Sequence, residues 1–464
     1  MSGLFLTRRR FLGAAAATAL APWGARSIAL RMPARPRPSA PQLEWQREER
    51  ALFLHFGVNT FTDREWGDGQ EDPAIFAPSR LDTRQWMRIA RDAGFRAAIL
   101  TAKHHDGFCL WPSRTTAHSV ANSPWRGGAG DLVREFVDAS REAGLKPGLY
   151  LSPWDRNAAV YGDSPRYNDF YCDQLTELLT HYGRIHEVWF DGANGEGPNG
   201  KKQTYDWPRV WGLVRRLQPQ AVMFSDAGPD VRWIGNEQGL AGDPNWSTVV
   251  PEVVPVPGTG GREATLMMQH GDPAGSVWRP GETDVSIRPG WFHHPAEDAR
   301  VRSVDNLVNL YFTSVGRNSK LLLNVPPTRE GLIADVDASR LSGLHGRLTT
   351  LFGNDLAAKR HMAWHSSGDK TAAGEIDLGR SVAVGIADLR EPIERGQTIA
   401  KYRLEGFDGQ TWRPLSSGTT IGCKKLDRFP AVSVERIRFT VDDSAATPQP
   451  VKIALFAPTT PTGT

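Results

Sequence analysis

The chain has little of several features that would place it in a particular class of protein. Only three of its 464 residues are cysteine, Cys109, Cys172 and Cys423, too few and too widely spaced for a disulfide framework or a zinc knuckle. Lysine and arginine outnumber aspartate and glutamate by 55 to 52, which does not indicate a nucleic-acid-binding surface. No periodic repeat recurs along the chain. These absences favour a globular protein that acts on a small neutral ligand.

Long apolar runs are also missing, even at the N-terminus. The segment TRRRFLGAAAATALAPWGA (7–25) has a basic start, a short apolar stretch and small residues, which is the layout of an export signal. Its apolar part is too short to span a bilayer, so no membrane span is expected. Arg8 and Arg9 are typical of the twin-arginine type of signal, although a basic unstructured tail would share part of the pattern. We expect a signal at 1–31, a Pro-rich linker at 32–44, and a periplasmic or extracellular mature protein.

From about residue 45, short apolar runs alternate with amphipathic segments. Asp82 and Asp131 precede two of these segments and Gly94 and Gly144 follow them, as caps do at the ends of helices. Strands are expected at 51–61, 95–105, 145–154 and 186–192, and helices at 82–94, 131–144, 168–183 and 205–219. Such alternation predicts a parallel sheet with helical crossovers.

The second half of the chain is less regular. Strands are expected at 221–228, 231–237 and 320–327, with a long Gly- and Pro-rich region before 303–316 and a last helix at about 337–353. Six or more units favour an α/β fold of the (β/α)8 (TIM) barrel type at 45–353, irregular in its second half, over an open doubly wound sheet. No glycine-rich phosphate loop follows the first strand, which weighs against a nucleotide-binding fold. Residues 354–464 alternate polar and apolar between turn signals, which predicts an antiparallel β-sandwich.

The active site of such a barrel lies at the carboxyl ends of its strands. Polar and aromatic residues collect at these ends: His55, Glu65 and Trp66; Lys103, His104, His105 and Asp106; Trp154 and Asp155; Asp191; and then Arg232 and Glu237. Asp191 is the most telling of them, because a carboxylate that emerges from the apolar run VWF needs a cation, hydrogen-bond donors or a substrate as its partner. Asp191 and Gly192 could instead form a plain turn, but their place at a strand end favours a site residue.

Other residues of this set leave alternatives open. His104, His105 and Asp106 could bind a metal, but adjacent strand residues point to opposite faces, so we expect no metal site and no cofactor. Glu237 could be an exposed loop acid. The tryptophans could be packing residues, although the sixteen in this chain, many of them beside polar residues, suit stacking on sugar rings.

Seven segments, in this order, resemble the retaining α-L-fucosidases of glycoside hydrolase family 29: HFGVNTF, EWGDG, AKHHDGFCLW, YLSPWDRN, VWFDGANG, VRWIGNEQG and LLLNVPP. They are most similar to the branch that cleaves α-1,3- and α-1,4-linked fucose. The resemblance covers about residues 45 to 350. It implies a barrel followed by a β-sandwich, and an enzyme that releases terminal L-fucose from a fucosylated oligosaccharide or glycoconjugate by double displacement.

The resemblance also assigns roles, residue by residue. Asp191 falls on the family's nucleophile, and Glu237 in GNE on the acid/base, with Glu196 as the fallback. Residues expected to bind the substrate are His55, Glu65, Trp66, His104, His105, Trp154, Arg232 and Trp291. The remaining alternatives are another barrel exo-glycosidase, such as a galactosidase, and a glycan-binding protein without catalysis. The sequence does not give the natural glycan, the oligomeric state, the signal cleavage site or the role of the C-terminal domain.

Overall fold

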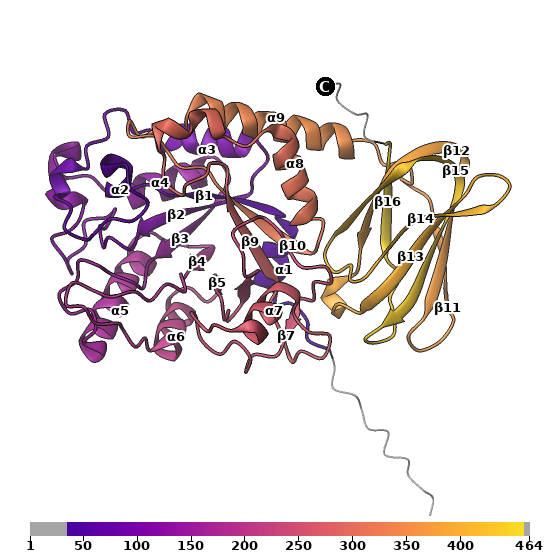
Figure 1. Ribbon diagram of the computed structural model, residues 1–464, viewed down its shortest axis with the longest axis horizontal. Helices are drawn as coiled ribbons and strands as arrows, with labels where there is room; N and C mark the ends of the chain where they lie inside the picture. The colour runs from indigo at the N-terminus through magenta and orange to yellow at the C-terminus, as the bar shows by residue number, and fades with distance from the viewer. Residues whose placement is uncertain (1–34, 459–464) are drawn as a thin grey trace, which may run out of the picture. The chain divides into compact units, whose positions relative to one another are not determined.

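The computed structural model describes residues 35–458 and contains an eight-stranded parallel barrel and a C-terminal antiparallel sheet domain (Figure 1). Hydrogen bonds close the barrel in the order β1-β10-β9-β6-β5-β4-β3-β2. Its strands are β1 (Arg50–Leu54), β2 (Ala97–Lys103), β3 (Lys146–Leu151), β4 (Glu187–Trp189), β5 (Val222–Ser225), β6 (Val231–Trp233), β9 (Gly281–Ser286) and β10 (Ser319–Asn324). The barrel prediction is confirmed. The expected export signal lies outside the described residues.

Helices connect most of the strands and cover the barrel. They are α1 (Ala40–Arg47), α2 (Val58–Thr62), α3 (Thr83–Asp92), α4 (Leu132–Glu142), α5 (Ser164–His181), α6 (Trp207–Leu217), α7 (Arg262–His270), α8 (Val304–Thr313) and α9 (Asp335–Phe352). Asp82 and Asp131 cap α3 and α4 as predicted, each accepting a backbone N–H of the first turn. The strand expected at 51–61 is shorter, since β1 ends at Leu54 and α2 begins at Val58.

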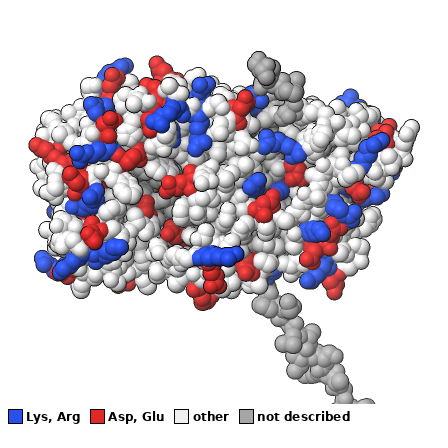
Figure 2. All heavy atoms as spheres, in the orientation of Figure 1, with Lys and Arg blue, Asp and Glu red and all other residues white. Residues whose placement is uncertain are grey.

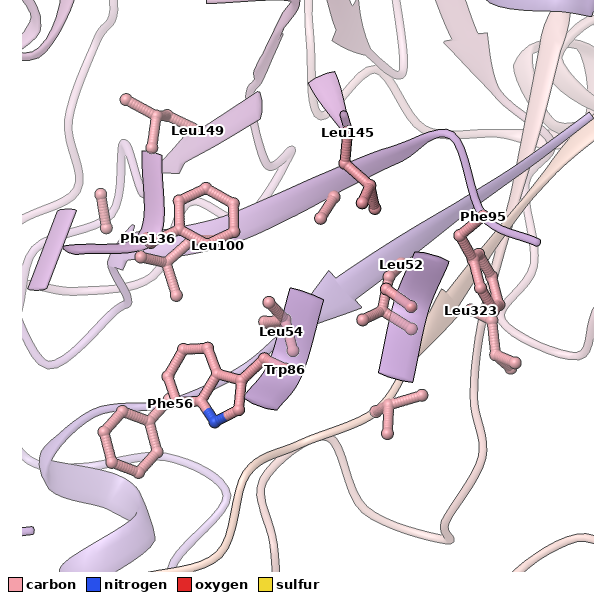
Figure 3. Close-up of a cluster of buried hydrophobic side chains, with 14 of the residues drawn as sticks. Leu52, Leu54, Phe56, Trp86, Phe95, Leu100, Phe136, Leu145, Leu149 and Leu323 are labelled. Carbon is pink, nitrogen blue, oxygen red and sulfur yellow. The ribbon is translucent and has the colours of Figure 1, made fainter. Parts of the chain in front are cut away.

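Apolar side chains between the strands and the helices form the main core. Leu52 and Leu54 of β1 and Leu100 of β2 are completely buried in one cluster with Trp86 of α3 and Phe136 of α4 (Figure 3). Burial of each such side chain contributes about 1.5–3 kcal/mol. Because the strands are anchored on this side, their carboxyl ends are held in fixed positions.

The second half of the barrel departs from the strand-helix alternation. Only residues 226–230 connect β5 to β6, with no helix between the strands. Asp230 closes this turn, because its N–H donates to the Met223 carbonyl and its carboxylate accepts the Met223 N–H. The connection from β6 to β9 contains α7 and a small antiparallel pair, β7 (Thr248–Val249) and β8 (Val277–Trp278). The expected irregularity is therefore confined to the connections, and the ring of strands is complete.

Strand β9 lies within the region that the sequence indicated only as rich in glycine and proline. All six of its residues are buried, yet Glu282, Thr283 and Asp284 are polar. Trp189 Nε1 donates to Glu282 Oε1 at 3.0 Å, and the Thr283 hydroxyl lies 2.7 Å from that of Ser319. Hydrogen bonds thus replace apolar contacts in this strand, which is why no apolar run marks it.

The linker prediction for 32–44 is wrong at its end, where α1 begins at Ala40. Ser39 and Gln42 form a capping box, and Pro41 stands in the first turn, where its missing N–H removes no helical bond. Trp45 of this helix is fully buried and donates to Glu187 Oε2 at 2.9 Å. The segment is thus part of the folded barrel.

The C-terminal domain is one six-stranded antiparallel sheet around its own apolar core. Its strands are β11 (Met362–Ser366), β12 (Ala372–Arg390), β13 (Ile399–Phe407), β14 (Trp412–Gly418), β15 (Lys425–Ser444) and β16 (Lys452–Phe456). Shifts of register interrupt the pairing of the two longest strands, β12 and β15, as β-bulges do where a sheet bends. Within residues 35–458, no helix combines the length and the apolar character that crossing a bilayer requires.

Candidate active site

A cavity of about 390 Å³ opens at the carboxyl ends of the barrel strands. Its lining combines aromatic side chains, three histidines and five carboxyl groups. The lining residues that carry these groups are Phe53, His55, Glu65, Trp66, His104, His105, Tyr150, Trp189, Asp191, Phe224, Asp226, Trp233, Glu237, Asp284 and Trp291. Among the described residues of this lining there is no lysine or arginine. The cavity therefore suits a neutral ligand with polar groups and apolar faces.

Asp191 lies two residues beyond the end of β4, as its place in the sequence indicated. Its Oδ1 accepts the Ala193 N–H at 2.7 Å, and its Oδ2 accepts the Tyr150 hydroxyl at 3.2 Å. Burial raises the pKa of Asp191, and these two hydrogen bonds oppose the rise. The arrangement fixes the direction of the carboxylate and stabilises its ionised form in an apolar setting.

Glu237 enters the same cavity from the loop after β6. Burial raises the pKa of its carboxyl group, the negative charges of Asp191 and Glu65 raise it further, and a hydrogen bond from the Trp291 side chain opposes them. Burial and neighbouring charge thus favour the protonated form of Glu237, whereas two hydrogen bonds favour the ionised form of Asp191. A pair of carboxyl groups held in different protonation states in one cavity is what acid-assisted nucleophilic displacement requires.

His55 and His105 use one ring nitrogen each for structure. His55 Nδ1 lies 2.9 Å from Asn324 Oδ1, and His105 Nδ1 lies 2.7 Å from Ser152 Oγ. Asn324 and Ser152 each donate elsewhere, to backbone carbonyls, so the oxygens facing the rings are acceptors and the two Nδ1 atoms carry the protons.

Burial lowers the pKa of both rings to about 3, which makes them neutral at pH 7. With Nδ1 protonated in a neutral ring, Nε2 can only accept a hydrogen bond. The second ring nitrogen of His55 and of His105 is therefore an acceptor for a hydroxyl group of a ligand.

His104 and His105 both face the cavity, which corrects one premise of the sequence analysis. They follow the last residue of β2, so the alternation of a strand does not apply to them, and their ring centroids are 4.1 Å apart. Burial and the neighbouring His105 lower the pKa of His104. Within residues 35–458, no group of three or more His, Cys, Asp and Glu side chains has the geometry to hold a metal ion.

The tryptophans expected at the site occupy different positions. Trp66 and Trp291 line the cavity, and Trp66 is 60% exposed at its mouth. Trp154 is not one of the lining residues; its ring centroid lies 4.9 Å from that of His105, and its Nε1 donates to the Glu196 carbonyl. Trp154 thus supports a histidine of the cavity, while the carboxylate of Glu196 is exposed to solvent.

Arg232 does not reach the cavity, although Trp233 beside it does. Its guanidinium is buried and donates to the carbonyls of Met268 and Arg279 and, at 2.7 Å, to Asn245 Oδ1. Successive residues of β6 point to opposite sides, so only one of this pair can face inward. The placement of Arg232 favours a structural role in the long connection between β6 and β9.

Two carboxyl groups of the cavity were not singled out from the sequence. Asp226 follows β5 and accepts the Gly258 N–H at 3.0 Å, and burial raises its pKa to about 6. Asp284 of β9 accepts the Trp233 Nε1–H at 2.7 Å, and burial together with the charge of Glu237 raises its pKa to about 8. Asp226 stands in FSDAG, where an aspartate after an apolar run repeats the signal that revealed Asp191. Asp284 lies inside a strand that the sequence did not indicate.

Comparisons with known proteins identify the family of this fold and cavity. The sequence profile described as Alpha-L-fucosidase matches residues 23–350, well over half of the chain. The chain is 45% identical to Alpha-L-fucosidase 1 of Arabidopsis thaliana over 443 residues, which cover 89% of this chain and 86% of the plant protein. The chain belongs to the α-L-fucosidases of glycoside hydrolase family 29. The enzyme is thus a glycoside hydrolase, as the motifs predicted.

Solved structures agree with this assignment. A putative α-L-fucosidase from Bacteroides ovatus is 44% identical and has a TM-score of 0.82, covering 92% of this chain and 75% of the other. A family 29 fucosidase of Ruminococcus gnavus, solved in complex with fucose, is 30% identical with a TM-score of 0.81, covering 92% of this chain and 96% of the other. The barrel and the C-terminal sheet domain match the fold of these structures.

Proposed function

We propose that the enzyme removes single terminal α-L-fucose units with retention of configuration, and that it prefers α-1,3 and α-1,4 linkages in branched oligosaccharides. The observation that carries the mechanism is the shared cavity of Asp191 and Glu237. One carboxyl group is held by donors that favour its ionised form, and partial burial together with the charges of Asp191 and Glu65 favours the protonated form of the other. The limited volume of the cavity supports cleavage at a chain end.

In the proposed first step, the Asp191 carboxylate attacks the anomeric carbon of fucose. The bond to the leaving oxygen breaks, and Glu237 transfers its proton to that oxygen. In the second step, Glu237 takes a proton from water as the water oxygen attacks the same carbon and displaces Asp191. Each step inverts the centre, so the free sugar has the configuration of the substrate.

Recognition of fucose is proposed to depend on the histidines and the tryptophans that line the cavity. The Nε2 atoms of His55 and His105 accept hydrogen bonds from sugar hydroxyls, because both rings are neutral and carry their proton on Nδ1. Trp66 and Trp291 offer aromatic faces to the C–H groups and to the C6 methyl. A neutral ligand also agrees with the surface, where acidic and basic side chains are interspersed on the face drawn in Figure 2.

The linkage preference is supported by the GNEQG motif around Glu237. We expect kcat/KM for Lewis-type branched trisaccharides to exceed that for an aryl α-L-fucoside and for 2-fucosylgalactose by about tenfold or more, the scale of one or two well-made contacts. Similar values for the three substrates would reject the linkage preference and leave the fucosidase activity untouched. The anomer released first, followed by NMR before mutarotation, tests retention separately.

Export is the remaining part of the proposal, and Arg8 and Arg9 support it. Replacing both by lysine should leave the precursor in the cytoplasm, because the twin-arginine transporter reads the arginine pair. Fractionation of cells that express the wild-type and the variant chains measures this. Equal amounts of exported protein would contradict the twin-arginine assignment.

A further inference from the structure

His294 lies between two carboxylates of another loop. Its Nδ1 is 2.8 Å from Asp63 Oδ1, and its Nε2 is 2.7 Å from Glu65 Oε1. A neutral imidazole has one N–H and one lone pair, and a lone pair facing a carboxylate oxygen at this distance is repulsive. Both contacts are favourable only when the ring carries two protons. The geometry therefore indicates an imidazolium.

Glu65 connects this imidazolium to the active-site cavity. Besides His294, its carboxylate accepts the N–H groups of Trp291, at 2.9 Å, and Phe292, at 3.2 Å. The packing is close, since a Cβ on Gly290 would lie 2.2 Å from Glu65 Oε1. Glu65 thus holds the loop after β9 against the loop after α2.

Each of the two joined loops supplies one tryptophan to the cavity. Trp66 follows Glu65 directly, and Trp291 precedes His294 by three residues. Trp291 also donates a side-chain hydrogen bond to Glu237. A change in the spacing of the loops would therefore move two aromatic walls and the partner of the proposed acid.

We propose that His294 is a positioning residue of the fucosidase site, which as an imidazolium joins Asp63 and Glu65 and thereby fixes Trp66 and Trp291 around the substrate. This inference depends on the fucosidase activity but not on the linkage preference. The expected substrate-binding role of Glu65 is extended by it, because three of the hydrogen bonds to its carboxylate come from the loop of residues 290–294.

The proposal predicts a pH dependence of definite sign. Burial disfavours the charged ring, but the hydrogen bonds and charges of Asp63 and Glu65 outweigh it, so the pKa of His294 is raised. The neighbouring His293 adds no positive charge near neutral pH, since burial and Arg288 lower its pKa to about 4. A group with a raised pKa keeps its interaction at low pH and loses it as the pH rises through that pKa. Substrate binding should therefore weaken on the alkaline side.

The test is Asp63→Asn, assayed with an aryl α-L-fucoside. Asp63 does not line the cavity and its side chain is 55% exposed, so kcat/KM at pH 6 should stay within about twofold of wild type. Loss of one carboxylate should shift the alkaline rise of KM to lower pH by about half a unit to one unit, with little change in kcat. The NMR titration of the His294 ring, assigned through its loss in His294→Gln, should shift by the same amount.

Asp68→Asn is the matched control. It removes the same charge from an exposed position of the same loop, and Asp68 makes no contact with His294. Its pH profile should stay within about 0.2 units of wild type, because exposed charges at a distance are screened by salt.

His294→Gln provides the second measurement. A glutamine amide can donate from its nitrogen but not from its oxygen, so KM should rise several-fold at every pH and its alkaline rise should disappear. Wild-type enzyme in which the His294 ring titrates at or below about 6.5 would overturn the imidazolium. If the titration of the His294 ring shifts in Asp63→Asn but the alkaline rise of KM does not, the proposed role of His294 in substrate binding would be overturned.

Discussion

The two halves of the active-site cavity carry opposite kinds of ionisable group. The ends of β1 and β2 contribute His55, His104 and His105, and the strands from β4 onward contribute four of the five carboxyl groups, the fifth being that of Glu65 in the loop after α2. Burial lowers the pKa of the three histidines and raises the pKa of the carboxyl groups of Asp191, Asp226, Glu237 and Asp284. Both halves are therefore shifted towards their neutral forms.

The comparison shows where charge is tolerated. Asp191 accepts both a hydroxyl and a backbone N–H within the cavity, whereas Asp284 accepts a single indole N–H. Hydrogen-bond donors lower the cost of ionisation in a buried site, so Asp191 is the carboxyl group best prepared to be the anion. In such surroundings a carboxylate is weakly solvated, and the desolvation cost of binding a neutral sugar is small.

Loss of Asp191 should have the largest effect. Asp191→Ala should lower kcat by about 10⁴-fold or more on every fucoside, since no covalent glycosyl-enzyme can form. Added azide can take the empty place and attack the substrate directly. NMR of the product should then show a fucosyl azide of inverted configuration.

Asp226→Asn is the matched control for this variant, because Asp226 is a carboxyl group of the same cavity and its amide can still accept from Gly258. We expect a loss of less than about tenfold, since the amide preserves the hydrogen bond. An Asp191→Ala enzyme with substantial activity, or an Asp226→Asn enzyme without any, would place the nucleophile elsewhere.

Loss of Glu237 should have a large effect that depends on the leaving group. Glu237→Ala should slow hydrolysis of oligosaccharides by about 10²–10⁴-fold, because their leaving oxygen needs a proton. Dinitrophenyl fucoside needs none, so its first step should change far less. Azide should attack the covalent intermediate of this variant and give a product of retained configuration. Equal losses on both kinds of substrate would contradict the role of acid.

The first half of the cavity was accessible from the sequence because its folding signals are local. Asp82 and Asp131 cap helices beside apolar runs, and the histidines follow such runs directly. The second half depends on contacts between distant segments. Asp284 lies in a strand whose polar residues are paired across the barrel, and no periodicity of the sequence marks it.

Contacts that form only on folding also explain why the sequence analysis missed His294 and placed Arg232 at the site. His294 acquires its partners from a loop more than 200 residues earlier, and Arg232 faces away from the cavity because β6 alternates. The family motifs indicated the proposed nucleophile, Asp191, and the proposed acid, Glu237, without such contacts. Orientation of side chains, tautomers and pKa shifts required the folded barrel.

Asp284 offers a sharper test of the carboxyl-rich half. Its raised pKa means that the folded state holds a proton that the unfolded chain releases above about pH 4, so stability falls as pH rises towards 8. Asp284→Asn cannot ionise and can still accept from Trp233. Its Tm should exceed that of wild type by about 2 °C near pH 7.5, the scale of 1 kcal/mol in a large domain, and by less at pH 5.

Activity should separate the two functions of the Asp284 side chain. Asp284→Ala leaves the indole N–H of Trp233 without its acceptor, which costs about 1–3 kcal/mol, and kcat/KM should fall by about tenfold or more. Asp284→Asn should lose less. A Tm gain of Asp284→Asn that does not grow with pH would show that Asp284 is ionised in the folded enzyme. That result would contradict the conclusion that burial keeps the carboxyl groups of this half close to their neutral form.

The smallest effect is expected at Glu196, the fallback for the acid. Its side chain is exposed, and the contact that joins it to the site, from Trp154 Nε1, is made by its backbone carbonyl. Glu196→Gln keeps that carbonyl and removes only a solvated charge, so kcat/KM on a branched trisaccharide should stay within about twofold of wild type at every pH. A loss of about 10²-fold that spares dinitrophenyl fucoside would instead transfer the acid/base role to Glu196, because that pattern follows proton donation and no other function of a surface carboxylate.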